Sequence, residues 1–539
     1  MFHVLKKNFK ILLTVVVTAS TVIFASTYLG SADSAPLRVW TEPSMKQIRL
    51  NQLPGDSSDI QLVAARGEVE SFQIGVRAVS NNVGSIDVDV SDLVNGNRNK
   101  ISKNKITLYR EHYINVPKAS PRDFNLNPSQ GAGWYPDALV PFKDPITKKD
   151  LTGAKLDAVP FVPKLNRNQP FWVDIKVPRG AAPGTYQGTY TVTSDRSTFT
   201  GKITLKVWDF TLPISPSLKS AFYFDDQGYP QLHKELLQHK MMPKRVHPDR
   251  AREMIDHYGL NVLRLPYWSG ANVHTCQMKD PPSVETVRRK IAEYPKDLTL
   301  YVFSADEIEN CQNLEAPLRK WAKVVRAAGA KHLLVTSPKP ELHDDGTGTG
   351  RSVADIWVVK PSMYENHSKD IADVMKKGDE VWFYTGYSNP YSPKWLLDYP
   401  AIDFRIPQGF ISQSMGIEGV LFWKTDLWTE KDPWKDITAP SFSDKNRVFP
   451  GDGMLLYPGQ KVGVNGVVPS MRMKWIRDGI EDYEYIEILK KLGEKQWALQ
   501  VSRSVGADWQ NWTKDPRRLE VARHKLGSRI EAIMRERKR

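Results

Sequence analysis

The chain has 539 residues, of which 40% are hydrophobic and 25% charged, so it is long enough for several domains and too apolar for a disordered protein. Its net charge of +14 comes from Lys and Arg spread along the whole length rather than gathered in a motif. We therefore expect no nucleic-acid partner; a basic surface that meets anionic polymers or a membrane face is the milder expectation.

Residues 1–36 have the pattern of an export signal. Three lysines precede an apolar run over residues 11–29, and small residues suitable for cleavage before Ala35 follow it. The run is also close to the ~20 residues that span a bilayer, so an uncleaved membrane anchor is the alternative. Either way we expect an exported protein that is secreted, periplasmic or attached to the cell-surface membrane.

Residues 37–215 predict an antiparallel β-sandwich domain. Short segments alternate between apolar and polar residues or are rich in β-branched and aromatic residues, with Pro and Gly between them. The clearest segments are residues 71–79, 86–93, 171–178, 184–194 and 201–213. Residues 115–168 form a long insertion that we expect to be irregular. An ordered loop of that length usually has a role, such as bridging to the next domain or edging a site.

Residues 216–440 predict a (β/α)₈ TIM-like barrel, because apolar strand-like runs alternate with amphipathic helical ones. The expected strands are residues 219–224, 241–247, 261–268, 298–304, 331–336, 354–359, 380–385 and 418–424. The second of these has the weakest pattern, and an open doubly wound sheet is the alternative. Residues 441–539 contain a loop rich in Gly and Pro and then helical patterns. They predict a C-terminal helical extension packed on the barrel.

The two cysteines of the chain, Cys276 and Cys311, follow the third and fourth expected strands. Loops after neighbouring barrel strands are adjacent, so the two residues can reach the Cα spacing of ~5.5 Å that a disulfide needs. An exported chain permits such a bond. We therefore expect a disulfide that braces the rim of the barrel.

Asp306 and Glu307 end the fourth expected strand, in the stretch "LTLYVFSADEIEN". Chemistry in such a barrel is located at the carboxyl ends of the strands, which favours a catalytic role over two acids on a solvated loop. Neighbouring acids diverge and cannot flank a glycosidic bond as a conventional retaining pair does. They suit substrate-assisted hydrolysis, in which the acetamido group of the sugar attacks its own anomeric carbon.

Six further residues near the expected strand ends are candidates for substrate binding. Trp382 and Tyr384 share one face of the seventh strand, where a Tyr could bind the acetamido carbonyl and a Trp could stack on a sugar ring. The others are Trp268, Trp423, Asp426 and Trp428. A place in the barrel core is the stronger interpretation for Trp382 and an equal alternative for Tyr384. For Asp426 a loop cap is an equal alternative. No ligand spacing predicts a metal site, and we expect no cofactor.

Two stretches near the C-terminus, "FPGDGMLLYPG" (449–459) and "VPSMRMKWIRDGIEDYEYIEIL" (468–489), resemble the signature of glycoside hydrolase family 123. The motifs "GWYPDALVP", "PGTYQGTYTV" and "DFTLP" are similar to the sandwich region of that family. Characterised members are β-N-acetylgalactosaminidases that use an Asp-Glu pair and substrate assistance. The resemblance implies Asp306 as the residue that polarises the acetamido group and Glu307 as the acid/base. The family pair is commonly followed by Pro, where this chain has Ile308.

Together these patterns predict a retaining exo-glycoside hydrolase that removes terminal β-linked N-acetylhexosamine from a glycan or polysaccharide. The preference for GalNAc is implied by the resemblance alone. Two alternatives stay open: a catalytically silent surface protein that binds polysaccharide, and a hydrolase of a non-acetamido sugar with a distant carboxylate as nucleophile. The helix-like segment "RDGIEDYEY" (477–485) is acid-rich, and we expect a structural role for it.

Overall fold

The computed structural model describes residues 36–96, 99–123, 126–225, 229, 231–385, 390–428, 432–440, 444 and 446–538. Apart from Pro36, the expected signal or anchor lies outside these residues. Pro36–Arg539 form one compact unit, so the boundaries that we place at residues 215 and 440 are proposals within that unit. Among the helices described, none is both long and apolar enough to cross a membrane.

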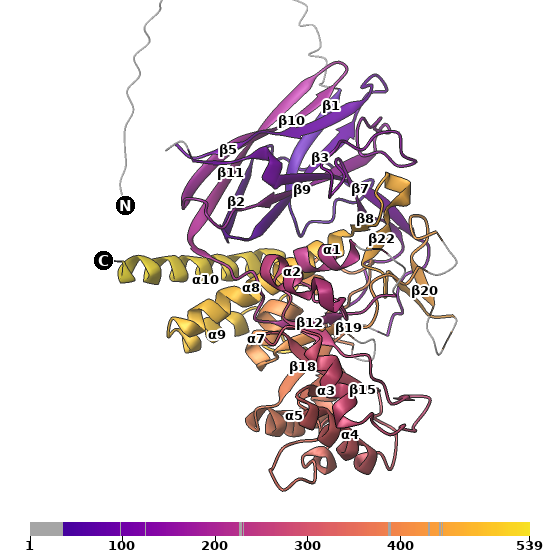
Figure 1. Ribbon diagram of the computed structural model, residues 1–539. Coiled ribbons are helices and arrows are strands. Elements are labelled where there is room, and N and C mark those ends of the chain that lie inside the picture. The colour runs from indigo at the N-terminus through magenta and orange to yellow at the C-terminus, as the bar shows by residue number, and fades with distance from the viewer. Residues whose placement is uncertain are drawn as a thin grey trace, which may run out of the picture. The chain divides into compact units, whose positions relative to one another are not determined.

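Eleven strands before residue 215 form two sheets (Figure 1). They are β1 (Leu37–Pro43), β2 (Ile60–Arg66), β3 (Val69–Ala78), β4 (Ile86–Val90), β5 (Leu93–Val94), β6 (Lys100–Ile101), β7 (Ile106–Val116), β8 (Gly133–Pro141), β9 (Asn168–Lys176), β10 (Gly184–Ser194) and β11 (Thr198–Thr211). A 3₁₀ turn, η1 (Lys103–Lys105), precedes β7. One sheet has the order β1-β3-β9-β7-β8, and the other has β2-β11-β10-β5-β6 with β4 on β10.

Neighbouring strands in these sheets are antiparallel except for β2 and β11, which are parallel. Side chains alternate between the faces as a period of two requires: Ile86, Val88 and Val90 of β4 are buried, whereas Asp87 and Asp89 are exposed. The predicted antiparallel sandwich is present in this sheet-rich region, with that one parallel pair.

The insertion at residues 115–168 is more regular than expected, because β8 pairs with β7 along one edge of the first sheet. The expectation of irregular structure is therefore wrong for Gly133–Pro141. Its other parts reach residues later in the chain: Ser120 donates its N–H and Oγ–H to the carboxylate of Asp398, and Asn127 Nδ2 donates to Asp403 Oδ2 at 2.6 Å. The insertion thus ties the sandwich to the segment before β19.

The second part of the chain forms a curled, all-parallel sheet with helices (Figure 1). The strand order is β12-β19-β18-β17-β16-β15-β13, and a short strand, β14, also pairs with β15. The strands are β12 (Lys219–Phe222), β13 (Val262–Arg264), β14 (Ala271–Asn272), β15 (Thr299–Asp306), β16 (Lys331–Val335), β17 (Ile356–Val359), β18 (Glu380–Tyr384) and β19 (Gly419–Phe422). This is the TIM-like arrangement expected for residues 216–440, with two departures.

The first departure is the expected strand at residues 241–247, which is wrong. In space, the short segment 242–244 fills the place between β12 and β13. Phe222 N–H donates to Met242 O at 2.9 Å, and Arg264 N–H donates to Lys244 O at 3.0 Å. Pro243 stands in the middle of this segment and has no N–H to give to a ladder. The gap in the curled sheet is therefore bridged by single hydrogen bonds rather than by a full strand.

The second departure is the connection from β16 to β17, which contains only the 3₁₀ turn η2 (Pro340–Leu342) where a (β/α)₈ repeat requires a helix. The other connections carry α1 (Leu232–Gln238), α2 (Pro248–Tyr258), α3 (Val284–Ala292), α4 (Glu315–Ala328), α5 (Pro361–Lys376), and α6 (Ile402–Arg405), π-helix η3 (Pro407–Ile411) and α7 (Ser412–Met415) in succession. Prolines and three glycines with positive φ, Gly346, Gly348 and Gly350, disfavour a helix in the β16–β17 connection.

Helix α4 shows why the remaining helices form where they do. Leu318, Trp321, Ala322 and Val325 are buried at the i, i+3, i+4, i+7 spacing of one helix face, and they pack onto the sheet. The helix ends where Gly329 adopts a left-handed conformation with φ of 98°, and its N–H donates to Arg326 O.

The C-terminal region begins with two small hairpins and ends with three helices. The hairpins are β20 (Thr438–Pro440) with β21 (Val448–Pro450), and β22 (Leu456–Pro458) with β23 (Val467–Pro469); a 3₁₀ turn, η4 (Gly459–Val462), follows β22. The helices are α8 (Met471–Lys491), α9 (Lys495–Arg503) and α10 (Pro516–Arg537). Figure 1 shows α8 and α10 between the two-sheet region and the parallel sheet.

Helix α8 is buried over most of its length, and several of its charged residues are paired inside the protein. Arg472 forms a bidentate bond to Asp137 of β8, and both side chains are 0% exposed. Arg405, just before η3, forms a similar bond to Asp482. Removing one member of such a pair would leave an uncompensated buried charge. The acid-rich segment of α8 is therefore structural, as expected.

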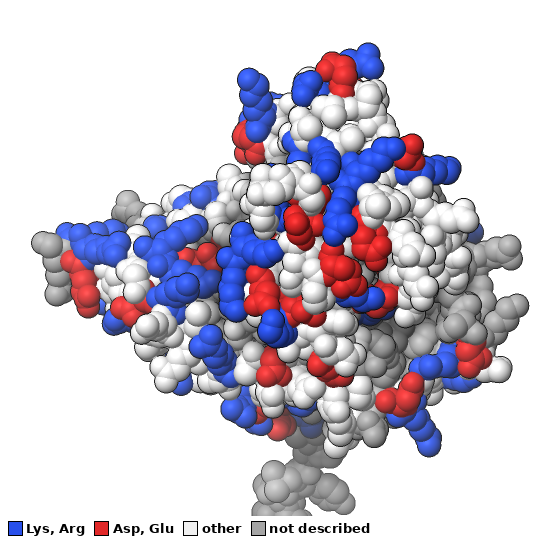
Figure 2. Space-filling view, turned by 90° about the horizontal axis from the view of Figure 1, so that it is seen from below, with Lys and Arg blue, Asp and Glu red and all other residues white. Residues whose placement is uncertain are grey.

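The basic surplus of the chain does not produce a single basic field on the face that Figure 2 shows. Lys and Arg side chains lie next to Asp and Glu side chains across most of that face. The structure also contains ion pairs between surface side chains, such as Arg252 with Asp297 and Lys369 with Asp373.

Candidate active site

Four polar side chains lie at the carboxyl edge of the parallel sheet. Arg264, Asp306 and Tyr384 are the last residues of β13, β15 and β18, and Lys360 directly follows β17. Because the carboxyl ends of parallel strands meet at one edge, these residues belong to one site. The position of Asp306 and Glu307 at this edge is the one expected from the sequence.

Asp306 is partly buried at the end of its strand. Burial and, after it, the neighbouring carboxylate of Glu307 raise the pKa of its carboxyl to about 6, against the opposite effects of Arg264 and Lys360. The carboxyl is ionised at neutral pH, but few contacts stabilise its negative charge. A carboxylate in this condition is stabilised by a cation or an N–H donor placed beside it.

Glu307 has different surroundings although it is the next residue. Its backbone is left-handed, with φ of 50°, an uncommon conformation for a non-glycine residue. Its Oε1 accepts a hydrogen bond from Tyr384 Oη at 2.5 Å and lies 3.3 Å from Lys360 Nζ. The side chain is 36% exposed, so a ligand can reach it.

Tyr384 acts as a donor to this carboxylate. Burial raises the pKa of its phenol well above the usual value, and the negative charge of Glu307 raises it further. The hydroxyl therefore keeps its proton at any working pH. Lys360 lies 5.8 Å from the centre of the Tyr384 ring, so the ammonium, the phenol and the carboxylate form one cluster.

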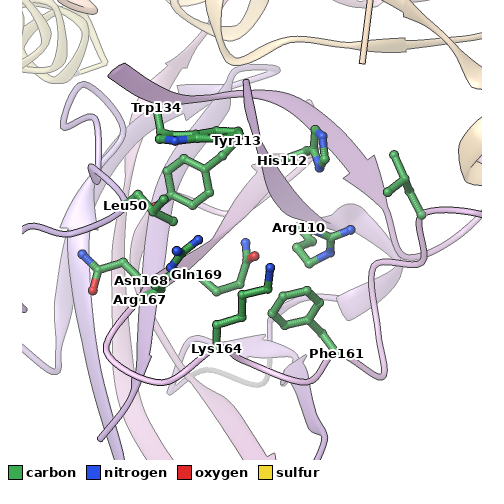
Figure 3. Close-up of a pocket in the computed structure, with 11 residues that line it drawn as sticks. Leu50, Arg110, His112, Tyr113, Trp134, Phe161, Lys164, Arg167, Asn168 and Gln169 are labelled. Carbon is green, nitrogen blue, oxygen red and sulfur yellow. The ribbon is translucent and has the colours of Figure 1, made fainter. Parts of the chain in front are cut away.

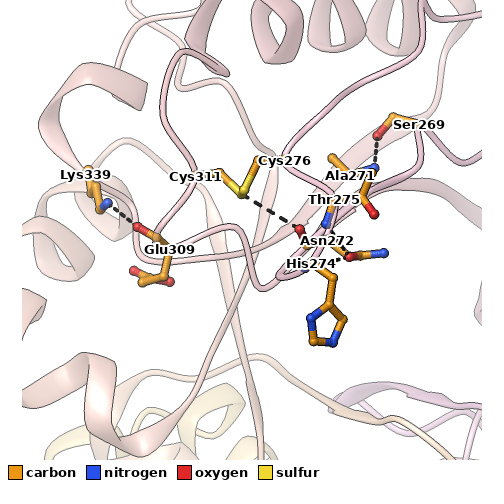
Figure 4. The surroundings of a disulfide bond; sticks show 9 residues. All are labelled: Ser269, Ala271, Asn272, His274, Thr275, Cys276, Glu309, Cys311 and Lys339. Carbon is orange, nitrogen blue, oxygen red and sulfur yellow. Dashed lines mark hydrogen bonds between the residues drawn. A yellow bond between two sulfur atoms is a disulfide. The ribbon is translucent and has the colours of Figure 1, made fainter.

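The loop that carries Glu307 is braced on both sides (Figure 4). The predicted disulfide is present between Cys276 and Cys311, with a Cα–Cα distance of 5.3 Å. On the other side, Glu309 accepts hydrogen bonds from Ser337 N–H at 3.1 Å, and Lys339 Nζ donates to Glu309 O at 2.7 Å. Ile308 is 5% exposed and belongs to the buried cluster between the parallel sheet and its helices.

Two aromatic rings lie beside Arg264. The guanidinium of Arg264 is 4.8 Å from the ring centre of Phe303 and 5.9 Å from that of Trp268. The Trp268 ring packs on Phe303 at 5.3 Å and is 37% exposed. Of the aromatic candidates, Trp268 thus offers an exposed face at this edge.

Trp382 does not offer such a face. It shares the inner side of β18 with Tyr384, as predicted, but it is 0% exposed and its Nε1 donates to Glu380 Oε2 at 3.0 Å. Trp382 and Tyr384 are two residues apart, or about 6.6 Å along the strand. This distance separates the buried interior of the curled sheet from its carboxyl edge. The structure therefore does not support substrate binding by Trp382.

The candidates after β19 mainly support loops. Both carboxylate oxygens of Asp426 accept the N–H of Asp225 at 3.1 Å, and burial raises the pKa of this carboxyl to about 6. Trp428 Nε1 donates to Leu456 O at 2.9 Å. Asp426 is 1% exposed and acts as the loop cap that we considered as the alternative.

Trp423 is partly exposed, and its Nε1 donates to Asp452 Oδ1 at 3.1 Å. Asp452 belongs to the "GDG" turn, so Trp423 joins the strand end to the C-terminal loop. Trp423 thus keeps an accessible position, which Trp382 lacks.

The sequence analysis missed Arg264 and Lys360. A lone cation carries no spacing signal, although Arg264 lies within one expected strand and Lys360 directly follows another. Among the residues described, no group of His, Cys, Asp and Glu could hold a metal ion. Two cavities of about 300 and 480 Å³ are lined by residues outside this site.

Comparisons with known proteins agree with the fold. The family model for the glycoside hydrolase 123 catalytic domain matches residues 283–489, which include Asp306 and Glu307. The model for the glycoside hydrolase 123 N-terminal domain matches residues 41–194, and the two ranges together span more than half of the chain. The chain is therefore a glycoside hydrolase. It belongs to glycoside hydrolase family 123, which confirms the resemblance of its motifs.

Solved structures support the same fold. A family 123 glycoside hydrolase from Clostridium perfringens is similar over 93% of this chain and 98% of its own, with 15% identity and a TM-score of 0.64. A β-glucuronidase from Parabacteroides merdae aligns over 78% of this chain and 49% of its own, with 8% identity and a TM-score of 0.28, too low to support any inference. No curated protein matches the chain.

Proposed function

We propose that the protein is a retaining exo-hydrolase of terminal β-linked N-acetylhexosamine that uses substrate assistance and prefers GalNAc. The observation that carries the proposal is the Asp306–Glu307 pair at the carboxyl end of β15. Asp306 accepts the acetamido N–H and stabilises the positive charge that develops on the cyclised sugar. Glu307 protonates the leaving oxygen and later activates water.

The contacts of the two carboxylates support this division of roles. Asp306 is the more enclosed group, and the charges of Glu307, Arg264 and Lys360 act on its carboxylate. Glu307 is accessible and oriented by Tyr384. An enclosed carboxylate suits a permanent electrostatic role, whereas an accessible one suits proton transfer to an oxygen that leaves the site.

The alternative of a distant carboxylate nucleophile has weaker support. A conventional retaining pair needs two carboxyl groups about 5 Å apart on different elements. The carboxylate of Glu309 is occupied by Ser337 N–H and Thr336 Oγ1, and that of Asp426 by Asp225 N–H. Either would have to leave its backbone contacts before it could attack a sugar.

The proposed sugar rests on the similarity of this chain to other proteins rather than on contacts within its own structure. The similar C. perfringens enzyme is described as acting in glycolipid glycan hydrolysis, which supports a glycan substrate for this chain. The preference for GalNAc follows the characterised members of the family that the motifs resemble. Trp268 supplies an exposed aromatic face on which a sugar ring could stack.

The test compares p-nitrophenyl β-GalNAc with the β-GlcNAc and β-galactoside analogues. We expect hydrolysis of the first two, with the β-GalNAc compound preferred, and no hydrolysis of the galactoside, which has no acetamido group. A thiazoline mimic of the cyclised sugar should inhibit competitively. Rapid hydrolysis of the galactoside, or a glycosyl adduct trapped on a carboxylate, would overturn substrate assistance. No hydrolysis of any compound, with polysaccharide still bound, would favour the silent binding protein.

We further propose that the protein is exported. Its N-terminal pattern and the Cys276–Cys311 disulfide support this, because disulfides persist in oxidising compartments. Cell fractionation followed by N-terminal sequencing tests it. A mature terminus near Ala35 indicates cleavage, an intact terminus in the membrane fraction indicates an anchor, and cytoplasmic recovery would contradict export.

A further inference from the structure

A second concave site lies in the sandwich, away from the catalytic edge (Figure 3). It is a cavity of about 300 Å³ between β7 and the segment 156–167, with the starts of β8 and β9 at its sides. This volume is at the lower end of the range for small-molecule sites. Its lining combines cations with aromatic rings, and neither group has a role in the proposed hydrolysis.

Arg110 is the buried part of this lining. It is 5% exposed, its Nε donates to Asp157 O at 3.0 Å, and its guanidinium lies 4.8 Å from the centre of the Phe161 ring. Among the residues described, none accepts a hydrogen bond from its two terminal nitrogens. The carboxylate of Asp157 lies near enough to raise the pKa of Arg110, but its oxygens accept the N–H groups of Gly153 and Ala154.

Such a guanidinium is costly to bury without an anionic partner. Burial lowers the pKa of Arg110 only to about 10, so the group remains charged at neutral pH. Two more cations, Lys164 and Arg167, line the same cavity, and neither forms an ion pair within the described part of the chain. Figure 3 shows Lys164 directed towards the middle of the cavity, near Arg110 and Gln169.

Aromatic rings complete the other side of the cavity. Trp134 is 45% exposed, and Figure 3 shows its indole next to the ring of Tyr113. A β-bulge between His112 and Tyr113 changes the pairing of β7 with β8 at this point. The extra residue at this point is Asp137 of β8, and Tyr113 lines the cavity together with Arg110 and His112.

We propose that this cavity binds an acidic sugar unit of a glycan, with its pyranose ring on Trp134 and Tyr113 and its anionic group on Arg110, Lys164 and Arg167. The exposed aromatic faces match the apolar side of a sugar ring, and the unpaired cations match an anionic oxygen group. Uronates and sulfated sugars share this chemistry. The site would hold an acidic glycan on the sandwich while the barrel acts on a chain end.

Binding is measured by calorimetric titration of the whole protein with four probes. They are methyl β-glucuronide, methyl β-galactoside 6-sulfate, neutral methyl β-galactoside and inorganic sulfate. We expect both acidic glycosides to bind at least about tenfold more tightly than the neutral one, and binding should weaken as salt rises. Bare sulfate should bind more weakly than the sulfated sugar. The stronger of the two acidic glycosides identifies the anion, a carboxylate or a sulfate.

Variants then locate the binding. Arg110→Gln should weaken it roughly tenfold or more, and the exposed double change Lys164→Gln with Arg167→Gln should weaken it severalfold. Lys155→Gln removes a nearby exposed cation that does not line the cavity, and it should have no effect. If Arg110→Gln does not fold, the double variant of Lys164 and Arg167 shows whether the acidic glycosides bind in the cavity.

The proposal fails if the neutral galactoside binds as tightly as the acidic glycosides, or if bare sulfate matches the sulfated sugar. It also fails if no acidic glycoside binds at millimolar concentration, or if Lys155→Gln lowers the affinity for the acidic glycosides as much as the double variant does. Asp306→Asn should bind the acidic glycosides normally, so this result is independent of whether the proposed hydrolysis is correct.

Discussion

Asp306 and Glu307 differ in their surroundings although they are neighbours in the sequence. Asp306 is mostly buried, and its pKa is raised to about 6, chiefly by that burial. Glu307 is more open and receives Tyr384 Oη. The two carboxylates should therefore fail in different ways when each loses its charge.

Glu307→Gln should lower the hydrolysis of glycans with poor leaving groups by roughly 10²–10⁴-fold, because the leaving oxygen then has no proton donor. Activated aryl glycosides need little protonation and should lose much less. Asp306→Asn should slow both kinds of substrate by roughly 3 kcal/mol or more in activation free energy, because a preorganised charge is removed. Steady-state kinetics on a p-nitrophenyl and an unactivated β-GalNAc glycoside measure this.

Glu341→Gln serves as the control, since Glu341 is an exposed carboxylate in the next loop. It should leave both rates unchanged. Equal losses on both substrates for Glu307→Gln would contradict its role as the acid.

Asp306 should also make stability depend on pH. Its pKa is about 6 in the folded protein and near 3.8 when unfolded, so the folded state binds more protons between these values. The stabilising contribution of the protonated group is present below pH 3.8 and is lost as pH rises through 6. Asp306→Asn should therefore be more stable than the wild type at pH 7.5, by up to about 3 kcal/mol, and nearly equal to it at pH 4.

Urea unfolding at the two pH values measures this difference, with the exposed Asp150→Asn as the control. A constant difference between Asp306→Asn and the wild type across pH would show that burial of the charged carboxyl is not its cause.

At the scale of elements, the loop after β15 takes its position from its braces as much as from its strand. The disulfide closes a segment of 35 residues, so its removal should cost roughly 2–4 kcal/mol through the entropy of the unfolded chain. Cys276→Ser with Cys311→Ser should lower the melting temperature and, because Glu307 lies in the braced loop, also kcat. Thermal unfolding and kinetics on the same preparations check both effects.

Dithiothreitol treatment of the wild type should reproduce the effect, and it should leave the double Ser variant unchanged. If kcat survives while the melting temperature falls, the disulfide stabilises the fold without positioning Glu307.

Elements with long apolar repeats were predictable, and those set by single residues were not. The stripe of Leu318, Trp321 and Val325 defines α4 without any tertiary knowledge. The expected strand at residues 241–247 failed because one proline removes the hydrogen bond on which a ladder depends. The β16–β17 helix is absent for a similar local reason, since Pro and Gly interrupt that connection.

The sequence predicted those site residues whose place follows from their position in a strand, and it did not predict the others. The end of a buried strand located Asp306 and Glu307 correctly, and the strand period correctly placed Trp382 and Tyr384 on one face. The period does not tell how deep a residue lies along the sheet, which separates buried Trp382 from Tyr384 at the mouth. Arg264 and Lys360 were missed because only the folded sheet brings them to the carboxylates.

At the scale of the whole molecule, one apolar core joins parts that the sequence divides. Trp172 and Trp208 of the sandwich strands belong to the same buried cluster as Phe422 of the parallel sheet and Trp475 of α8. Arg472 of α8 also forms its buried pair with Asp137 of β8. The sandwich, the parallel sheet and the C-terminal helices therefore bury parts of one another's surfaces.

We consequently expect the protein to unfold in one cooperative transition rather than in separate steps for the sandwich and the barrel. Calorimetry, with near- and far-ultraviolet circular dichroism recorded in parallel, measures this. A fragment of residues 37–215 should expose Trp172 and Trp208 and should aggregate or remain unfolded. Two resolved transitions, or a stable native-like fragment, would contradict the shared core.

The left-handed backbone at Glu307 has a consequence for selection. A φ of 50° costs a glutamate roughly 1 kcal/mol or more, and Gly or Asn would adopt it more easily. Glu307→Gly should therefore give an inactive protein that is at least as stable as the wild type, which thermal unfolding can measure. A lineage released from the need to hydrolyse glycans would gain stability by abandoning glutamate here. Glutamate at this position is therefore a residue that the stability of the fold alone does not favour.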